Sequence, residues 1–239
     1  MQAVRQVSDP TRLRKAAKIT TILHDALGPD LSGQSCLDTG CAVGIITDEL
    51  ARHFSRVMGV DVDARLVRQA HAHSLNGALF LLASGACLPF PNASFDVVVC
   101  AQVYEHVTDQ HGLAQEIYRV LRPGGSCFFS GPNKLAVLEE HYWLPFLSWL
   151  PQGLANAYMR LFKKGQVYDA WPLFYWQTRQ LWSAFEVRDY TVRMLRDPRR
   201  YAVEDKLAKA PWFAGLPDWF WRLAQPFLPN YNWVLLKPK

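Results

Sequence analysis

The sequence predicts an α/β protein whose core is a mostly parallel β-sheet with helices on both faces. In the first part of the chain, apolar runs of strand length alternate with segments of helical periodicity, which is the pattern of a parallel sheet covered on both sides. The alternation stops after Pro132, where an aromatic-rich segment begins. A chain of 239 residues is long enough for one α/β domain that carries an insertion.

Five strands are expected in the first part, each of them a short apolar run. They are Ser35–Asp38, Val57–Val60, Leu79–Leu82, Phe95–Cys100 and Ser126–Ser130. Helical patterns precede the first strand or lie between strands, and they are Arg12–Leu27, Ile46–Phe54, Ala64–His73 and Gln110–Leu121. Two later segments, Phe185–Met194 and Tyr231–Leu236, also have strand character and would complete a sheet of seven strands.

The second part of the chain differs from the first in composition. The 26 Lys and Arg residues exceed the 21 Asp and Glu residues by five, and this surplus lies wholly beyond residue 134, together with all nine tryptophans. A basic, tryptophan-rich segment suits an anionic or amphiphilic partner. A surplus of this size is also compatible with an ordinary solvated surface.

The sequence has no apolar run of the roughly 18 residues that a membrane span requires. The basic residues near its start are not followed by an apolar stretch, so no signal peptide is indicated. We therefore expect a cytoplasmic protein. Reduced thiols and no metal site are expected as well, because no C-x-x-C pair occurs among the five cysteines, Cys36, Cys41, Cys87, Cys100 and Cys127.

A glycine-rich segment, CLDTGCAVG, follows the first expected strand, with Asp38 at the strand's end and Gly40, Ala42 and Gly44 in the turn. Glycine tolerates positive φ and lets backbone N–H groups approach a ligand closely. The spacing differs from the G-x-G-x-x-G of dinucleotide sites, and the preceding carboxylate suits an ammonium group better than a phosphate. Asp61 ends the second strand about twenty residues later, where a carboxylate accepts bonds from both hydroxyls of a ribose.

Five motifs follow one another along the chain: D-x-G-x-A-x-G, G-V-D, L-P-F-P-x-x-S-F-D, E-H-V and R-V-L-R-P-G-G. Together they resemble the class I methyltransferases of the type 11 group, which includes quinone-biosynthesis methyltransferases. The resemblance covers roughly the first 134 residues. It implies a Rossmann-like sheet and S-adenosyl-L-methionine as the cofactor.

The same resemblance implies a cofactor role for eight residues. The methionine part of the cofactor would be surrounded by Asp38, Gly40, Ala42 and Gly44. The other contacts would be Asp61 at the ribose, Ser84 and Gly85 beside the adenine, and Gln102 closing over the methionine part.

Two of these residues depart from the pattern of the family. Ala42 replaces the middle glycine of the loop, a change that we expect to be harmless. Ser84 stands where many relatives have an aspartate that accepts a bond from the adenine amino group, and losing that charged acceptor would weaken binding by about 1 kcal/mol. Asp96 begins a buried strand, and we expect it to brace the fold rather than to contact the cofactor.

Methyl transfer from a sulfonium is an in-line displacement, so the enzyme supplies alignment, exclusion of water and, for some acceptors, a base. His106, in YEHV beyond the fourth strand, is the first candidate for that base, and His141, in EEHYW, is the second. Local packing is the alternative role for both histidines. Tyr104 and Tyr142 would pack in the core or shape the acceptor pocket.

An amphipathic helix is expected between Pro151 and Lys164. A helical wheel gathers its apolar residues on one broad face: Leu154, Ala155, Tyr158, Met159, Leu161 and Phe162. Its charges, all basic, lie opposite, and a second amphipathic helix begins at Pro217. The apolar faces either pack on the sheet's edge and form an acceptor pocket, or the first helix makes peripheral contact with the inner membrane surface.

The sequence thus predicts a cofactor-binding core (residues 1–134), an aromatic-rich helical cap (135–184), and final strands with an intervening helical segment (185–239). We expect a methyltransferase for a hydrophobic or amphiphilic small molecule: a lipid, quinone precursor, polyketide or lipid-linked sugar. One alternative is an RNA methyltransferase. It is disfavoured, as is any nucleic-acid partner, because no long Lys/Arg run or separate nucleic-acid module occurs. The other is a non-catalytic regulatory protein that binds S-adenosylmethionine.

Overall fold

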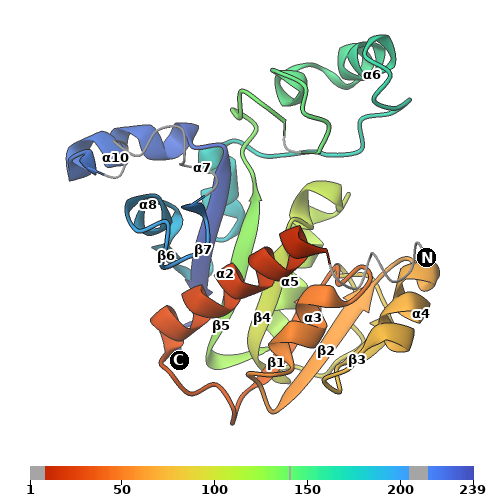
Figure 1. Cartoon of the computed structure of the whole chain (residues 1–239), viewed down its shortest axis with the longest axis vertical. Helices are drawn as coiled ribbons and strands as arrows, with labels where there is room; N and C mark the ends of the chain where they lie inside the picture. The colour runs from red at the N-terminus through yellow and green to blue at the C-terminus, as the bar shows by residue number, and fades with distance from the viewer. Residues whose placement is uncertain (1–8, 140, 205–214) are drawn as a thin grey trace.

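A computed structural model describes residues 9–139, 141–204 and 215–239 of the chain (Figure 1). Its centre is a seven-stranded sheet of order β3-β2-β1-β4-β5-β7-β6. The strands are β1 (Ser35–Thr39), β2 (Arg56–Asp61), β3 (Leu79–Leu82), β4 (Phe95–Ala101), β5 (Leu121–Pro132), β6 (Glu186–Asp189) and β7 (Asn230–Leu236). The first five run parallel, and β7 lies antiparallel between β5 and β6. The predicted fold class is confirmed.

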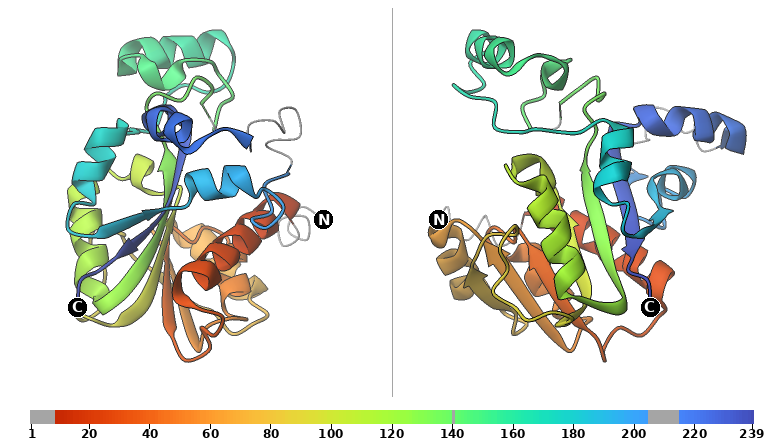
Figure 2. Two further views of the ribbon diagram at one scale, coloured as in Figure 1. Left: turned by 90° about the vertical axis from the view of Figure 1, so that its left-hand side faces the viewer. Right: turned by 180° about the vertical axis from the view of Figure 1, so that it is seen from behind.

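Helices cover both faces of this sheet (Figure 2). One face packs against α2 (Pro10–Leu27), α3 (Ile45–Leu50) and α8 (Thr191–Arg196). The other packs against α5 (Gln110–Val120) and α7 (Tyr175–Leu181), while α4 (Ala64–His73) lies beside β3. Successive strand residues point to opposite faces, so Cys36 joins the core under α2 and its neighbour Leu37 joins the core under α5.

Aspartates begin three of these helices. The side chain of Asp9 accepts a hydrogen bond from the Thr11 N–H at the start of α2, and Asp63 and Asp109 do the same for α4 and α5. Such caps satisfy backbone donors that have no partner inside the helix. They explain why these helices begin close to the predicted positions.

The expected strand Phe185–Met194 is wrong in its second half, where the chain forms α8 instead. The reason lies at Asp189, whose Oδ1 accepts a 2.7 Å bond from the Thr191 N–H and turns the chain into the helix. Tyr190 and Met194 are then buried four positions apart on one helix face. That spacing is helical, and it was hidden in the sequence by the β-branched residues around it.

Residues 135–139 and 141–172, here called the cap, stand beyond the end of β5 and away from the sheet (Figures 1 and 2). They include the 3-10 turn η2 (Leu147–Trp149) and α6 (Gln152–Leu161). The cap has a small apolar cluster of its own, formed by Leu144, Leu147, Ala155, Met159, Tyr168 and Ala170. The expectation that the α6 segment packs on the sheet's edge is therefore wrong, because its buried side chains lie inside the cap.

A second helix with exposed aromatic residues, α10 (Asp218–Ala224), precedes the short turn η4 (Gln225–Phe227) and β7. Trp221 is buried, whereas Trp219 and Leu223 are exposed. Across the described residues, the helices are too short or too polar for any of them to cross a lipid bilayer.

Candidate active site

The glycine-rich loop lies directly beyond β1, as the sequence predicts. Gly40, Ala42 and Gly44 all have positive φ, at 66°, 49° and 81°, the left-handed region that glycine adopts without steric cost. A Cβ at Gly40 would lie 2.5 Å from Cγ2 of Val103. The loop therefore packs closely against the residues that follow β4, and its shape requires the absence of a side chain at this position.

Asp61, at the end of β2, fixes this loop. Its Oδ2 accepts a 2.8 Å bond from the Ala42 N–H, and its Oδ1 accepts a 2.9 Å bond from the Asp63 N–H. Each carboxylate oxygen has a second lone pair available for a ligand hydroxyl. The structure thus gives Asp61 a loop-supporting role that sequence reasoning did not foresee, and it leaves acceptor capacity for the expected ribose contact.

A cavity of about 360 Å³ opens between the N-terminal half of α2 and the loop, within the range of small-molecule pockets. Of the eight expected cofactor residues, four line it: Asp38, Gly40, Ala42 and Gln102. Gly44 lines a separate hollow between α3 and α4. Asp61, Ser84 and Gly85 are outside the lining of either one. The Ala83 N–H donates to the Asp61 carbonyl at 3.0 Å, which keeps the Ser84 segment beside the end of β2.

Four basic side chains of α2 line the same cavity: Arg12, Arg14, Lys15 and Lys18. Lys18 also donates a 2.8 Å bond to Oδ1 of Asn232 on β7. Sequence reasoning did not identify this basic wall. The spacing of Arg14 and Lys18, four positions apart on a predicted helix, places them on one face, but the sequence does not indicate what that face covers.

Asp38 is a buried carboxylate at the floor of the cavity. The Thr47 hydroxyl donates to its Oδ2 at 2.6 Å. Burial raises the pKa of Asp38 to about 7; the Thr47 hydrogen bond opposes this rise, while the nearby negative charge of Asp61 adds to it. A positively charged ligand group in this cavity would favour the ionised carboxylate.

Gln102 follows β4 in a left-handed conformation, with φ of 61°. Its N–H donates to the Ser130 carbonyl at 2.7 Å, and its Nε2 donates to Oδ1 of Asn230 at 3.3 Å. Its Oε1 is buried and has no hydrogen-bond partner among the described residues. Because a buried acceptor without a partner is costly, this oxygen is suited to accept a bond from a ligand donor in the cavity that Gln102 lines.

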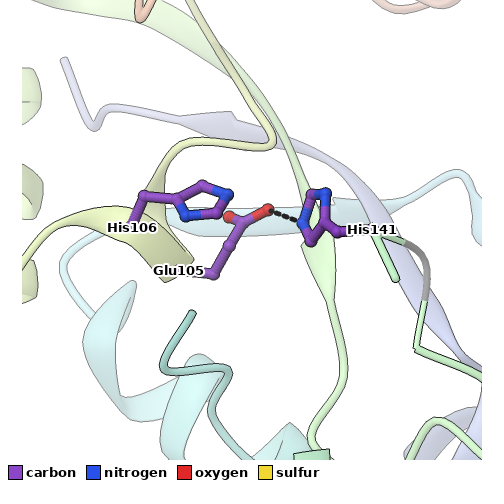
Figure 3. A group of neighbouring side chains, drawn as sticks. All are labelled: Glu105, His106 and His141. Atoms are coloured by element: carbon purple, nitrogen blue, oxygen red, sulfur yellow. Dashed lines mark ion pairs between the residues drawn. The ribbon is translucent and has the colours of Figure 1, made fainter. Parts of the chain in front are cut away.

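The structure brings both candidate bases together beside a carboxylate (Figure 3). His106 lies in the 3-10 turn η1 (Tyr104–His106), and His141 lies in the cap. Their ring centroids are 5.0 Å apart. Nε2 of His141 lies 3.5 Å from Oε1 of Glu105, which is fully buried. Glu105 was not a candidate from the sequence, although its position next to His106 in E-H-V was the available signal.

The backbone of the cap fixes this cluster. The Trp171 N–H donates to the Glu105 carbonyl at 2.7 Å, and Nδ1 of His106 bonds the Asp169 carbonyl at 3.0 Å. The Tyr142 hydroxyl donates to Oδ1 of Asp169 at 2.6 Å. These hydrogen bonds therefore connect η1 to both ends of the cap.

The cluster lies next to the cavity wall. Gln102 and Ser130 line the cavity. Glu105 lies three residues after Gln102 in the sequence. Oε2 of Glu105 is 3.6 Å from the position that a Cβ would take at Gly131, the residue after Ser130. Glu105, His106 and His141 themselves are outside the lining of this cavity.

Two other expectations concern residues that support the site. Tyr104 is fully buried, donates to the Pro132 carbonyl at 2.5 Å and accepts from the Leu173 N–H at 3.1 Å, so it has the expected core role. Asp96 accepts bonds from the N–H and the hydroxyl of Ser35, both at 2.8 Å, and pairs with Arg122. It braces the sheet, as predicted.

Comparison with known proteins agrees with this architecture. Residues 37–129 match a family model described as a methyltransferase domain, of type 11. The chain is 33% identical over 157 residues to the ubiquinone biosynthesis O-methyltransferase of Paracidovorax citrulli, covering 61% of this chain and 64% of that protein. It is 37% identical over 115 residues to a probable S-adenosylmethionine-dependent methyltransferase of Mycolicibacterium smegmatis, covering 48% and 44%. The chain thus spans less than two thirds of the length of these relatives.

The fold also matches solved structures. An S-adenosylmethionine-dependent methyltransferase from Mesorhizobium loti aligns with a TM-score of 0.58 and 17% identity, covering 89% of this chain and 95% of that one. At this identity the likeness concerns the fold.

Proposed function

We propose that the protein transfers the methyl group of S-adenosyl-L-methionine to a hydrophobic or amphiphilic small molecule, because residues 37–129 match the model of a type 11 methyltransferase domain. The observation that carries the proposal is the cavity at the glycine-rich loop. It combines a buried carboxylate, Asp38, with close backbone approach at Gly40 and a basic wall on α2. The methionine part of S-adenosyl-L-methionine matches this combination, because it has an ammonium group, a carboxylate and a positively charged sulfur.

The residues present fit the cofactor group by group. The ammonium would contact Asp38 and Oε1 of Gln102, and the carboxylate would face the basic side chains of α2. The two ribose hydroxyls would use the remaining lone pairs of Asp61. The adenine would lie beside Ser84 and Gly85, next to the end of β2.

The chain's own residues would align the acceptor and remove its proton. The bound cofactor supplies a methyl group on a positively charged sulfur, which is already a good leaving group. His106 follows Gln102 by four residues and lies beside His141. An acceptor hydroxyl presented on that side of Gln102 would approach both imidazoles, and either one is suited to act as the base. The cap would exclude water from this end of the site.

The acceptor class is proposed from two observations. Two relatives at 33% and 32% identity are named for ubiquinone biosynthesis, and the cap beside the histidines is rich in aromatic side chains. We therefore place phenolic quinone precursors first among the acceptors, ahead of lipids, polyketides and lipid-linked sugars.

Calorimetry with S-adenosylmethionine, followed by a methyl-transfer screen, tests the proposal. We expect micromolar or tighter binding of the cofactor, and transfer of a labelled methyl group to at least one phenolic or lipid-like acceptor. Binding without turnover on any acceptor or host extract would favour a non-catalytic regulatory protein. No binding would contradict the proposal itself.

We also propose that the cap contacts an anionic membrane surface. On α6 and directly after it, Leu154, Leu161 and Phe162 are 61%, 75% and 52% exposed. Arg160 and Lys163 lie on the same exposed segment. An apolar patch flanked by basic side chains is the composition of helices that lie at the level of lipid headgroups.

Reversal of the charges tests the membrane contact. A variant with Arg160, Lys163 and Lys164 changed to Glu should lose binding to phosphatidylglycerol vesicles by well over a hundredfold, since each basic residue near an anionic surface contributes about 1 kcal/mol. Sedimentation with vesicles at low salt measures this. A wild-type protein that stays in the supernatant would exclude the membrane contact and leave the methyltransferase proposal intact.

A further inference from the structure

Glu105 has an environment that the methyltransferase proposal leaves unexplained. Its side chain is fully buried, and neither carboxylate oxygen has a hydrogen-bond partner among the described residues. The one basic side chain within ion-pair distance of its oxygens in the described structure is His141, whose Nε2 is 3.5 Å from Oε1. Burying a carboxylate with so few partners is costly unless a cation compensates for it.

His106 is held in the orientation that a metal ligand requires. Its Nδ1 bonds the Asp169 carbonyl at 3.0 Å, and because a carbonyl oxygen only accepts, Nδ1 donates. In the neutral imidazole, Nε2 then carries the lone pair. Metal-binding histidines characteristically donate their second ring N–H to a backbone carbonyl or a carboxylate in this way.

We propose that Glu105, His106 and His141 form a binding site for one divalent transition-metal ion, with Zn²⁺ as the reference occupant. One ligand atom from each residue lies within 4.8 Å of the other two (Figure 3). A tetrahedral ion with bonds of 2.0–2.2 Å holds its ligand atoms roughly 3–3.5 Å apart. The two imidazoles are partly or largely exposed, so small rotations of their side chains close the difference.

The surrounding charges favour a cation. Tyr142 donates to Asp169, and the Oε2 of Glu139 accepts from the N–H groups of His141 and Tyr142, which places two more carboxylates around the cluster. Burial raises the pKa of the Tyr168 hydroxyl, and the negative charges of Glu139 and then Glu105 raise it further. Carboxylates therefore surround the two histidines, and this environment favours a bound cation.

The proposed ligands include no cysteine, so this site differs from the cysteine-based metal site that the absence of a C-x-x-C pair argued against. Two histidines and one glutamate with an open position are the ligands of catalytic zinc, whereas structural zinc is fully enclosed by protein ligands, most often cysteines.

The role of the ion rests on the proposed function. An acceptor hydroxyl in the open position would lose its proton to solvent, because coordination lowers its pKa. Its oxygen would then attack the methyl carbon, with the new O–CH₃ bond forming as the S–CH₃ bond breaks and S-adenosylhomocysteine as the leaving group. The histidines would act as ligands in the loaded protein rather than as bases.

The test uses chelator-treated, metal-free protein titrated with Zn²⁺ and Co²⁺ by calorimetry and visible absorption. It is performed in a Cys87→Ser background, since Cys87 is an exposed free thiol that would bind either ion. We expect one ion per chain and the absorption of Co²⁺ in a tetrahedral or five-coordinate site. Glu105→Gln, His106→Ala and His141→Ala should each weaken binding about a hundredfold or more.

His111→Ala is the matched control, because this exposed histidine lies nearby at the start of α5 and outside the cluster. It should leave metal affinity unchanged. Thermal melting of every variant separates loss of the site from loss of the fold. The proposal is overturned if metal-free wild type binds no ion stoichiometrically, or if binding survives in the His106→Ala/His141→Ala double variant.

Cofactor calorimetry on the same metal-free protein separates this proposal from the proposed function. We expect S-adenosylmethionine to bind with equal affinity in the presence and absence of Zn²⁺, because the loop and the cluster share no residue. Full methyl transfer in excess chelator would overturn the metal's role and leave the methyltransferase intact. Failure to bind the cofactor under both conditions would overturn the methyltransferase proposal, whatever the metal titration shows.

Discussion

Asp38 illustrates how one residue links the stability of the fold to the binding of a ligand. Its carboxylate is buried at the end of β1, with the Thr47 hydroxyl as its hydrogen-bond donor. Asp61 lies close enough to raise its pKa, and Arg12 acts weakly in the opposite direction. The folded protein therefore favours the protonated acid, whereas a cationic ligand favours the carboxylate.

The first prediction concerns this pKa. Because the pKa of Asp38 in the folded protein, about 7, lies above the ordinary aspartate pKa of 3.8, its stabilising contribution is fully present below pH 4 and is lost as the pH rises through 7. In Asp38→Asn this contribution does not titrate, so its free energy of unfolding should fall less than that of wild type between pH 5 and pH 8. Urea unfolding at both pH values measures the difference, and parallel pH profiles would contradict the prediction.

The second prediction concerns Asp61. Asp61→Ala should weaken S-adenosylmethionine binding by about 2–4 kcal/mol, because the ribose contacts and the bond that holds the Ala42 N–H are lost together. Calorimetry measures the dissociation constant. Asp63→Ala is the control, since this residue caps α4, and it should cost about 1 kcal/mol of stability with no change in affinity. An unchanged constant in folded Asp61→Ala would remove Asp61 from the site.

The third prediction concerns His106. His106→Ala should lower turnover by about a hundredfold or more and leave cofactor affinity nearly unchanged. Steady-state rates with the best acceptor from the screen, together with melting temperatures, measure this. If the loss of turnover is accompanied by an equal loss of stability, His106 has a packing role; full activity would exclude it from catalysis.

At the residue scale, the sequence predicted individual side chains better than their neighbours in space. The resemblance to type 11 methyltransferases implied roles for Gly40 and Gln102, and both residues line the cavity. Glu105 and the basic face of α2 could not be assigned from the sequence. Their significance depends on contacts with the cap and the loop, and these contacts form between segments that are far apart in the chain.

At the scale of elements, α6 shows what a helical wheel leaves undetermined. The wheel gathers six apolar residues on one face, yet only Ala155 and Met159 are buried, while Leu154 and Leu161 are exposed. The cap is too small to cover the whole face, so α6 buries one stripe and presents the other. Amphipathicity shows that a helix has an apolar face, but it does not show what covers that face.

This division gives the fourth prediction. Met159→Glu should destabilise the protein by several kcal/mol, because it buries a charge without a partner. Phe162→Glu, at a half-exposed position of the same helix end, should leave the stability within about 0.5 kcal/mol and abolish vesicle binding. Chemical unfolding and vesicle sedimentation measure the two effects. If both variants destabilise the protein equally, the exposed stripe is covered in solution.

At the scale of the whole molecule, the parallel half of the sheet could be predicted because β1, β2 and β4 are each followed by a covering helix. The position of β7 could not be predicted. It is the last strand of the chain, yet it is inserted between β5 and β6, which requires pairing over a long separation in sequence. The insertion also brings Asn230 to the cavity, where Gln102 donates to it, so the final strand completes the site as well as the sheet.

The last prediction tests this role of β7. Trp233 is fully buried, packs against Phe129 of β5, and donates from its Nε1 to Asp189 at 2.8 Å. Trp233→Ala should cost about 3–5 kcal/mol of stability, as large-to-small changes of buried aromatic residues do. For a chain of this length, that corresponds to a fall in melting temperature of roughly 10 °C. Trp219→Ala, on the exposed side of α10, should change the melting temperature by no more than about 2 °C. Calorimetric melting compares the two, and equal shifts would mean that β7 contributes no more to the core than a surface helix does.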